Sequence, residues 1–94
     1  MIKVNELIGL IKAYNPKTNY QLITQAYQYS KNMHRGQLRR SGEPYFMHPV
    51  SVAALLTEQR LDDATIITAL LHDTLEDTKS TYNEVEKIFG PEIV

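Results

Sequence analysis

Apolar residues recur along this chain at intervals of three and four positions, the spacing of one face of an α-helix. The first run occupies Val4 to Tyr14 and stops before Pro16, and a second extends from a cap at Thr18 or Asn19 to His34. We find no segment with the alternation of apolar and polar residues that is typical of a strand. The pattern therefore predicts an all-α chain.

Three further helices follow, and each has a recognisable first turn. The third begins at His48-Pro49, where a proline at the first helical position loses no hydrogen bond because that N–H has no partner in the helix. Asp62 is expected to cap the fourth helix, and Thr81 opens a capping-box pattern for the fifth, which ends at Gly90-Pro91. These signals predict a single domain built as a bundle of about five helices.

The end of the fourth helix, residues 70–78 with the sequence LLHDTLEDT, combines apolar and chemically active residues. At about 100° per residue, His72, Asp73, Glu76 and Asp77 fall within an arc of about 140°. The opposite side carries Ile66, Ile67, Leu70, Leu71 and Thr74. We therefore expect this helix to bury one face in the core and to present the other for chemistry.

His48 lies at the start of the third helix, and His72-Asp73 lie near the end of the fourth. These residues come together if the two helices pack antiparallel. Two imidazoles and a carboxylate are suitable ligands for Mn, Fe or Zn. Taken singly, His48 is equally explained as a helix cap bonded to the backbone, and His72-Asp73 as a surface pair. Their joint occurrence favours a metal site.

Glu76 and Asp77 follow one turn beyond these ligands. Carboxylates at a helix C-terminus oppose the helix dipole at a cost of about 0.3–1 kcal/mol each. A solvated helix end is the common explanation, but three acids in the last five residues predict a neighbouring cation. A cation there polarises a phosphoryl oxygen and lowers the pKa of a bound water, and Glu76 or Asp77 can then take the proton.

The connection over residues 36–47 has no helical period, and a loop of about twelve residues in a compact domain is usually functional or disordered. Its apolar end, Tyr45 to Met47, favours an ordered loop. Arg39 and Arg40 suit contact with phosphate or stacking on a base. A solvated basic loop is the alternative interpretation.

Composition and charge narrow the classes of function. The absence of cysteine excludes disulfides and thiolate metal sites and fits a reducing cytoplasm. The sequence shows no secretory signal or membrane span, so we expect a soluble chain. Residues 1–47 hold seven Lys/Arg and two Asp/Glu, and residues 48–94 hold three and nine, giving halves of +5 and −6. This asymmetry suits an anionic substrate beside a cation, or charge balancing between packed halves, but the basic charge is too dilute for nucleic acid.

Residues 34–49, HRGQLRRSGEPYFMHP, together with residues 70–78 and Phe89-Gly90, resemble the N-terminal HD hydrolase domain of RelA/SpoT-type stringent-response proteins. The similarity extends from about residue 18 to residue 91. A lone His-Asp pair is weak evidence for any family. The run from Ser41 to Tyr45, which starts seven residues before His48, makes the resemblance specific.

The resemblance implies a Mn2+-dependent hydrolase that removes pyrophosphate from the 3′ position of the guanine nucleotide (p)ppGpp and yields GDP or GTP. It implies His48, His72 and Asp73 as metal ligands. It also implies Glu76 and Asp77 as the pair that handles the attacking water and the proton. Arg39 matches a residue that supports the guanine, and Arg40 and Ser41 belong to the same nucleotide-contacting loop.

The family places a fourth metal ligand, another Asp, on a later helix. Residues 1–94 are therefore expected to form a partial HD hydrolase domain that binds Mn2+ weakly, with binding lost in His48→Ala and Asp73→Ala, and that is weakly active or inactive alone. The alternatives are a non-catalytic interaction module that keeps the helical scaffold, and one half of a split hydrolase completed by a complementary chain.

The last helix also leads to an expectation about assembly. Helices that pack against later elements in the complete domain should leave Ile88, Phe89, Ile93 and Val94 without cover, at about 25 cal/mol per Å² of exposed apolar surface. Apolar patches larger than a few hundred Å² usually mark association surfaces. We therefore expect a homodimer or larger oligomer built on the C-terminal helices.

Overall fold

The computed structural model describes residues 2–91 and 93, and this part of the chain contains helices and no strand. A single isolated bridge joins Leu38 and Pro44 in the loop that connects the second and third helices. The all-α prediction is confirmed. The helices are α1 (Val4–Lys12), α2 (Tyr20–Met33), α3 (Met47–Thr57), α4 (Asp63–Asp77) and α5 (Tyr82–Phe89).

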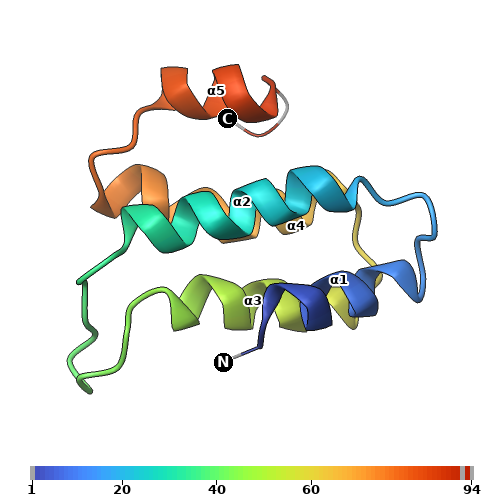
Figure 1. Cartoon of the computed structure of the whole chain (residues 1–94), viewed down its shortest axis with the longest axis horizontal. Helices are drawn as coiled ribbons and strands as arrows, with labels where there is room; N and C mark the ends of the chain where they lie inside the picture. The colour runs from blue at the N-terminus through green and yellow to red at the C-terminus, as the bar shows by residue number, and fades with distance from the viewer. Residues whose placement is uncertain (1, 92, 94) are drawn as a thin grey trace.

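The helices are arranged in layers around α2 and α4 (Figure 1). α1 and α3 lie on one side of this pair, and α5 lies on the other. α4 packs against both α2 and α3, and α1 contacts α2 and α3. Because α3 and α4 run antiparallel, the first turn of α3 lies beside the last turns of α4.

α4 is the central helix of the core. Its apolar face is the one that the sequence predicts, because all five residues expected to point inward are buried: Ile66, Ile67, Leu70, Leu71 and Thr74. The other helices contribute buried residues at helical spacing, among them Leu7, Ile11, Ile23, Tyr27, Val50, Val85 and Phe89. The core therefore fixes the rotation of α4 and leaves its other face accessible.

The predicted N-terminal caps of three helices are present. Asn19, Asp62 and Thr81 accept from the N–H groups of Leu22, Thr65 and Glu84 at 3.1, 3.0 and 3.2 Å. Thr18, the other candidate cap of α2, instead donates its hydroxyl to the Asp63 carboxylate.

The predicted boundaries shift by one or two residues. α3 begins at Met47 rather than His48, after the cap residue Phe46, so Pro49 is its third residue. The N–H groups of the first helical positions have no partner within the helix, so a proline, which lacks this group, is tolerated at the third position. His48 is therefore not the N-cap of α3. α1 ends at Lys12 instead of Tyr14 because residues 13 and 14 form a turn.

The cap of α5 gives a testable stability difference. Thr81→Ala removes the side-chain acceptor for the Glu84 N–H, and losing such a cap costs about 1 kcal/mol. We expect urea denaturation to show this loss. Thr68→Ala is the matched control, because that exposed hydroxyl bonds only a carbonyl within its own helix. A loss no larger than the control's would contradict the capping role.

The expected exposure of the C-terminal apolar residues is wrong for two of them. Phe89 and Ile93 are only 7% and 8% exposed, whereas Ile88 is 44% exposed, and Val94 lies outside the described residues. α5 folds back over α2, and Phe89 packs edge-on against Tyr29 with ring centroids 5.9 Å apart. Among the described residues, the argument for an oligomer built on the C-terminal helices therefore rests on Ile88 alone.

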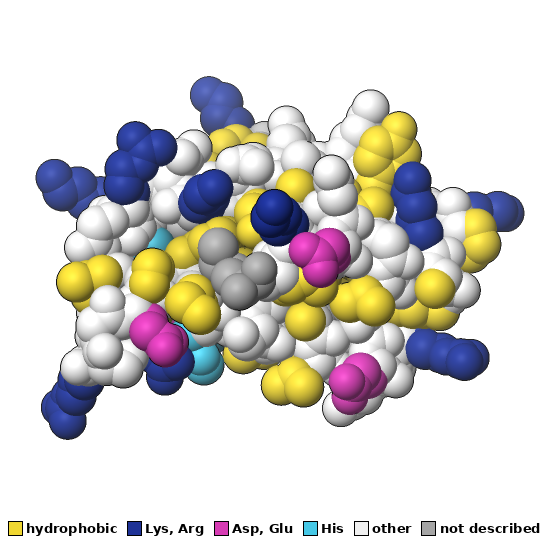
Figure 2. All heavy atoms as spheres, turned by 60° about the horizontal axis from the view of Figure 1, so that its bottom comes forward, with side chains coloured by type: hydrophobic (Ala, Val, Ile, Leu, Met, Phe, Trp, Pro, Cys, Tyr) yellow, Lys and Arg dark blue, Asp and Glu magenta, His cyan; other side chains and the backbone are white. Residues whose placement is uncertain are grey.

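Hydrophobic side chains are instead exposed on the face that α1 and α3 present (Figure 2). Leu10 and Leu55, which are 45% and 61% exposed, line a groove of about 440 Å³ between these helices. Among the described residues, the structure has no helix with the length and apolar character needed to cross a membrane.

Candidate metal and nucleotide site

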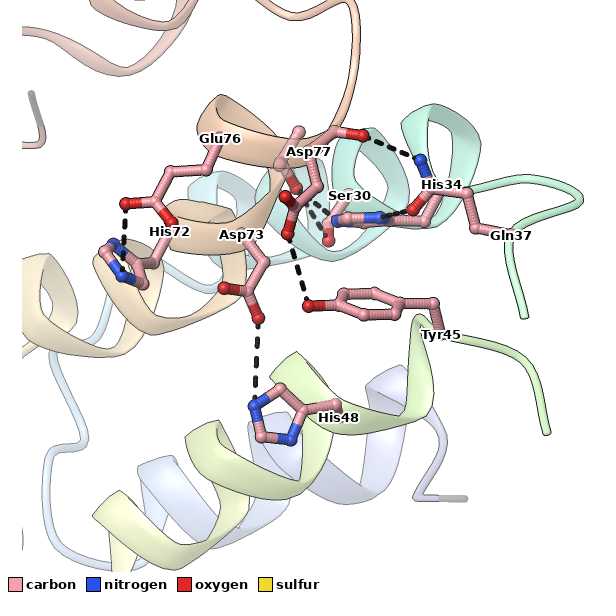
Figure 3. A network of polar contacts seen from close by, with 10 residues as sticks. Ser30, His34, Gln37, Tyr45, His48, His72, Asp73, Glu76 and Asp77 are labelled. Carbon is pink, nitrogen blue, oxygen red and sulfur yellow. Dashed lines mark hydrogen bonds and ion pairs between the residues drawn. The ribbon is translucent and has the colours of Figure 1, made fainter. Parts of the chain in front are cut away.

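The antiparallel packing of α3 and α4 brings two predicted ligands together. His48, on the first turn of α3, points at α4, with its Nε2 3.8 Å from Oδ2 of Asp73 (Figure 3). His72 lies on the exposed side of α4, with its Nε2 3.8 Å from Oε1 of Glu76 one turn further on. The imidazoles therefore flank Asp73 and Glu76 from two helices.

Three of these residues can converge on one ion. His72, Asp73 and Glu76 each offer a ligand atom, and the three atoms lie within 4.8 Å of one another. His48 lies outside this group and reaches it through Asp73. The sequence analysis assigned Glu76 to proton transfer, whereas the geometry also places it among the possible ligands. Imidazole nitrogens and carboxylate oxygens are a donor set that suits Mn, Fe or Zn, so the residues present fit such an ion.

The electrostatic environment of this cluster is acidic. α4 carries Asp73, Glu76 and Asp77 in its last five residues and has no basic residue in its last turn. Within residues 2–91 and 93, the basic side chains in contact with these carboxylates are both histidines: His48 lies 3.8 Å from Asp73, and His72 lies 3.8 Å from Glu76. The negative end of the helix dipole adds to the same field. A bound cation would relieve this repulsion.

Two side chains donate hydrogen bonds to backbone carbonyl oxygens at the end of α4. Gln37 donates its Nε2 to the carbonyl oxygen of Asp77 at 2.8 Å, and Thr78 donates its hydroxyl to the carbonyl of Thr74 at 2.6 Å. Since the last carbonyls of a helix have no partner within it, these bonds fix the last turn. The bond from Gln37 also ties the loop after α2 to the acidic cluster.

Tyr45 contacts the cluster from the same loop. Its phenol donates to Oδ2 of Asp77 at 3.3 Å (Figure 3). Burial raises the pKa of Tyr45, and the charges of Asp73 and Asp77 raise it further. The phenol therefore stays protonated at neutral pH and acts as a donor.

The loop that carries the two arginines is a short hairpin. Its arms are joined by hydrogen bonds from the Arg39 N–H to the Glu43 carbonyl at 2.8 Å and from the Tyr45 N–H to the Gln37 carbonyl at 2.9 Å. Gly42 closes the turn at φ 89°, a conformation that favours glycine. The predicted nucleotide residues lie together, because Arg39, Arg40 and Ser41 line a cleft of about 610 Å³ with Leu38, Glu43 and Tyr45.

The site residues predicted from the sequence did not include three residues that the structure places here: His34, Gln37 and Tyr45. His34 was equally explained as a partner of the helix dipole or as a ligand contact. His34 is 2% exposed, and it continues the buried face of α2 that includes Ile23, Ala26, Tyr27 and Ser30. That spacing was a usable signal, because a histidine on an apolar helical face must find partners inside the protein. Gln37 and Tyr45 left no comparable signal, since their contacts depend on how the loop meets α4.

Comparison with known proteins identifies the family of this chain. The profile of the HD domain family matches residues 26–94, which include both histidine-bearing helices and the hairpin. The chain belongs to the HD domain family. The resemblance to RelA/SpoT-type proteins is confirmed as well, because the similarity to members of that group covers almost the whole chain.

Three relatives show the extent of this similarity. The HD domain described here is 50% identical to the GTP pyrophosphokinase rsh of Brucella melitensis biotype 1 over 93 residues, which is 99% of this chain and 12% of that protein. It is 49% identical over 83 residues to a GTP pyrophosphokinase of Myxococcus xanthus, covering 88% of this chain and 11% of the relative.

This HD domain is also 46% identical over 93 residues to the bifunctional (p)ppGpp synthase/hydrolase SpoT of Escherichia coli K12, covering 99% of this chain and 13% of SpoT. The chain thus spans only 11–13% of the length of these relatives.

Proposed function

We propose that this HD domain hydrolyses the 3′-pyrophosphate of (p)ppGpp in a metal-dependent reaction. The observation that carries the proposal is the meeting of His48 with Asp73, next to the group formed by His72, Asp73 and Glu76. The relative SpoT, described as a (p)ppGpp synthase/hydrolase, supports the choice of substrate. The basic hairpin cleft beside the acidic cluster suits an anionic nucleotide bound next to a cation.

We infer Mn2+ as the metal, held by His72, Asp73 and Glu76, with His48 on the side of Asp73. When bound, the ion polarises a phosphoryl oxygen and lowers the pKa of a coordinated water. The family resemblance adds another Asp ligand from outside the matching segments. Binding by residues 1–94 alone should accordingly be weak.

The carboxylates at the end of α4 handle the proton in this proposal. Asp77, which lies outside the ligand group, accepts a proton from the attacking water, or Glu76 does so where it does not hold the ion; the oxygen of that water bonds to the phosphorus attached to the ribose 3′ oxygen. The bond between that phosphorus and the 3′ oxygen breaks, and the proton is passed to the 3′ oxygen. The products are pyrophosphate and GDP or GTP, so all atoms are accounted for.

The hairpin holds the nucleotide. Arg39 and Arg40 provide planar guanidinium groups that stack on a base or pair with phosphate, and the Ser41 hydroxyl offers a further polar contact. All three are exposed and line the same cleft, so a ligand can reach them without rearranging the core.

Arg39→Ala is expected to weaken nucleotide binding without blocking the reaction. Losing one charged contact of this kind raises the half-saturating concentration about tenfold, and the maximal rate should change much less. Titration of the protein against ppGpp in the hydrolysis assay measures both. Arg35→Ala is the control, since Arg35 bonds Asn32 instead of lining the cleft. Equal effects of the two substitutions would remove Arg39 from the site.

The proposed activity is tested with the 94-residue chain in excess over ppGpp, in the presence of Mn2+, so that slow turnover is detected. We expect release of pyrophosphate and GDP, dependent on Mn2+ and absent in His72→Ala. No product from the chain, either alone or with the rest of the SpoT HD domain supplied in trans, would contradict the proposal and favour a non-catalytic interaction module. Cleavage at the 5′ end would contradict it as well.

A further inference from the structure

A buried histidine connects three parts of the fold behind the proposed site. The ring of His34 is enclosed between α2, the hairpin and α4, and both of its nitrogens have partners. Nε2 lies 3.0 Å from the hydroxyl of Thr74, and Nδ1 lies 2.7 Å from Oε1 of Gln37.

The Gln37 amide fixes one proton on this ring. Its Nε2 donates to the carbonyl oxygen of Asp77 at 2.8 Å, so its Oε1 faces His34 (Figure 3). An amide oxygen only accepts hydrogen bonds, and therefore Nδ1 of His34 must carry a proton. The donor and the acceptor of each hydrogen bond are thus defined, from His34 to Gln37 and from Gln37 to the Asp77 carbonyl.

Tyr45 extends this chain to the carboxylate. Its ring stacks on His34, with centroids 5.1 Å apart and planes inclined by 27°. Its N–H donates to the carbonyl of Gln37 at 2.9 Å, and its phenol donates to Oδ2 of Asp77 at 3.3 Å. Asp77 is therefore held at two atoms, by Gln37 at the carbonyl and by Tyr45 at the side chain.

We propose that Tyr45 is a positioning residue that holds the Asp77 carboxylate in one orientation, with His34 and Gln37 fixing Tyr45 in turn. We call these three residues the Asp77 clamp. Its role in catalysis rests on the proposed function, because the orientation of Asp77 matters most if that carboxylate moves a proton. Tyr45 also lines the nucleotide cleft, so the same side chain fixes the position of the Asp77 carboxylate relative to that cleft.

The clamp has a clear physical purpose. Asp77 is exposed at the end of a helix, where a carboxylate without contacts samples several staggered rotamers. A proton acceptor that occupies its productive orientation only part of the time lowers the rate in proportion. A stacked, hydrogen-bonded phenol selects one rotamer while Asp77 stays open to solvent.

The clamp is tested first without any activity measurement. Side-chain scalar couplings from NMR report the χ1 rotamer of Asp77, and nitrogen-15 spectra report whether Nδ1 of His34 is protonated. We expect one dominant rotamer and a protonated Nδ1 in the wild type, and rotamer averaging at Asp77 in Tyr45→Phe. Tyr29→Phe is the matched control, because it removes a phenol that bonds the Glu84 carboxylate away from this site.

Kinetics then ask whether Tyr45 acts through Asp77. We expect Tyr45→Phe to lower the maximal single-turnover rate about tenfold with little change in half-saturation, and to have no further effect in an Asp77→Asn background. An equal loss in both backgrounds would overturn the positioning role, as would an unchanged Asp77 rotamer in Tyr45→Phe. If the wild type has no activity, the proposed function fails and the rotamer measurement alone decides the clamp.

Discussion

Replacing Asp73 with alanine is expected to abolish Mn2+ binding and hydrolysis together. Asp73 is the residue at which the two helices meet, because it faces His48 at 3.8 Å and belongs to the group with His72 and Glu76. Without the Asp73 carboxylate, His72 and Glu76 no longer have a ligand group beside them that also contacts His48 on α3. A loss of at least about 1,000-fold in hydrolysis, equivalent to about 4 kcal/mol, is expected.

Calorimetry with Mn2+ and the single-turnover assay measure the two effects separately. His48→Ala should lose Mn2+ binding too, because the Asp73 carboxylate then loses the imidazole that contacts it from α3. Glu86→Ala is the control, since Glu86 is an exposed acid on α5. Equal Mn2+ binding by the wild type, His48→Ala and Asp73→Ala would remove the metal site from the account.

Leu70→Ala is expected to cause the largest loss of stability. Leu70 is fully buried at the middle of α4, the helix that packs against both α2 and α3. Truncating such a leucine costs about 2–5 kcal/mol through lost burial and the cavity left behind. A domain of this size has only about 5–15 kcal/mol of stability, so a large share would be lost.

Urea denaturation gives the comparison directly. Leu55→Ala makes the same chemical change at a side chain that is 61% exposed, and it should alter stability by less than about 0.5 kcal/mol. Similar losses for the two variants would show that α4 is not the centre of the core.

The helical periodicity predicted the elements and the two faces of α4 because the buried side chains of this helix recur every three or four residues. His72, Asp73, Glu76 and Asp77 share the open side, and the residues opposite them fill the core. The meeting of His48 with Asp73 followed from the antiparallel pairing of neighbouring helices. These features depend on local spacing and on short connections, which a sequence displays.

The remaining features depend on contacts between distant segments. The caps at Asn19 and Thr81 were local and predictable, but the contacts of Gln37 and Tyr45 with Asp77 join residues 40 and 32 positions apart. The cover over Phe89 likewise depends on the path of α5 across Tyr29. No period in the sequence encodes where such segments meet.

The central claim, that these helices form the metal site of a (p)ppGpp 3′-pyrophosphohydrolase, is tested most directly by transplantation. The matching segment of Escherichia coli SpoT, to which this chain is 46% identical, is replaced by residues of this domain, and ppGpp hydrolysis is measured with Mn2+. We predict a chimera that releases pyrophosphate and GDP and loses this activity on His72→Ala. A folded chimera that binds Mn2+ but does not hydrolyse ppGpp would contradict the claim.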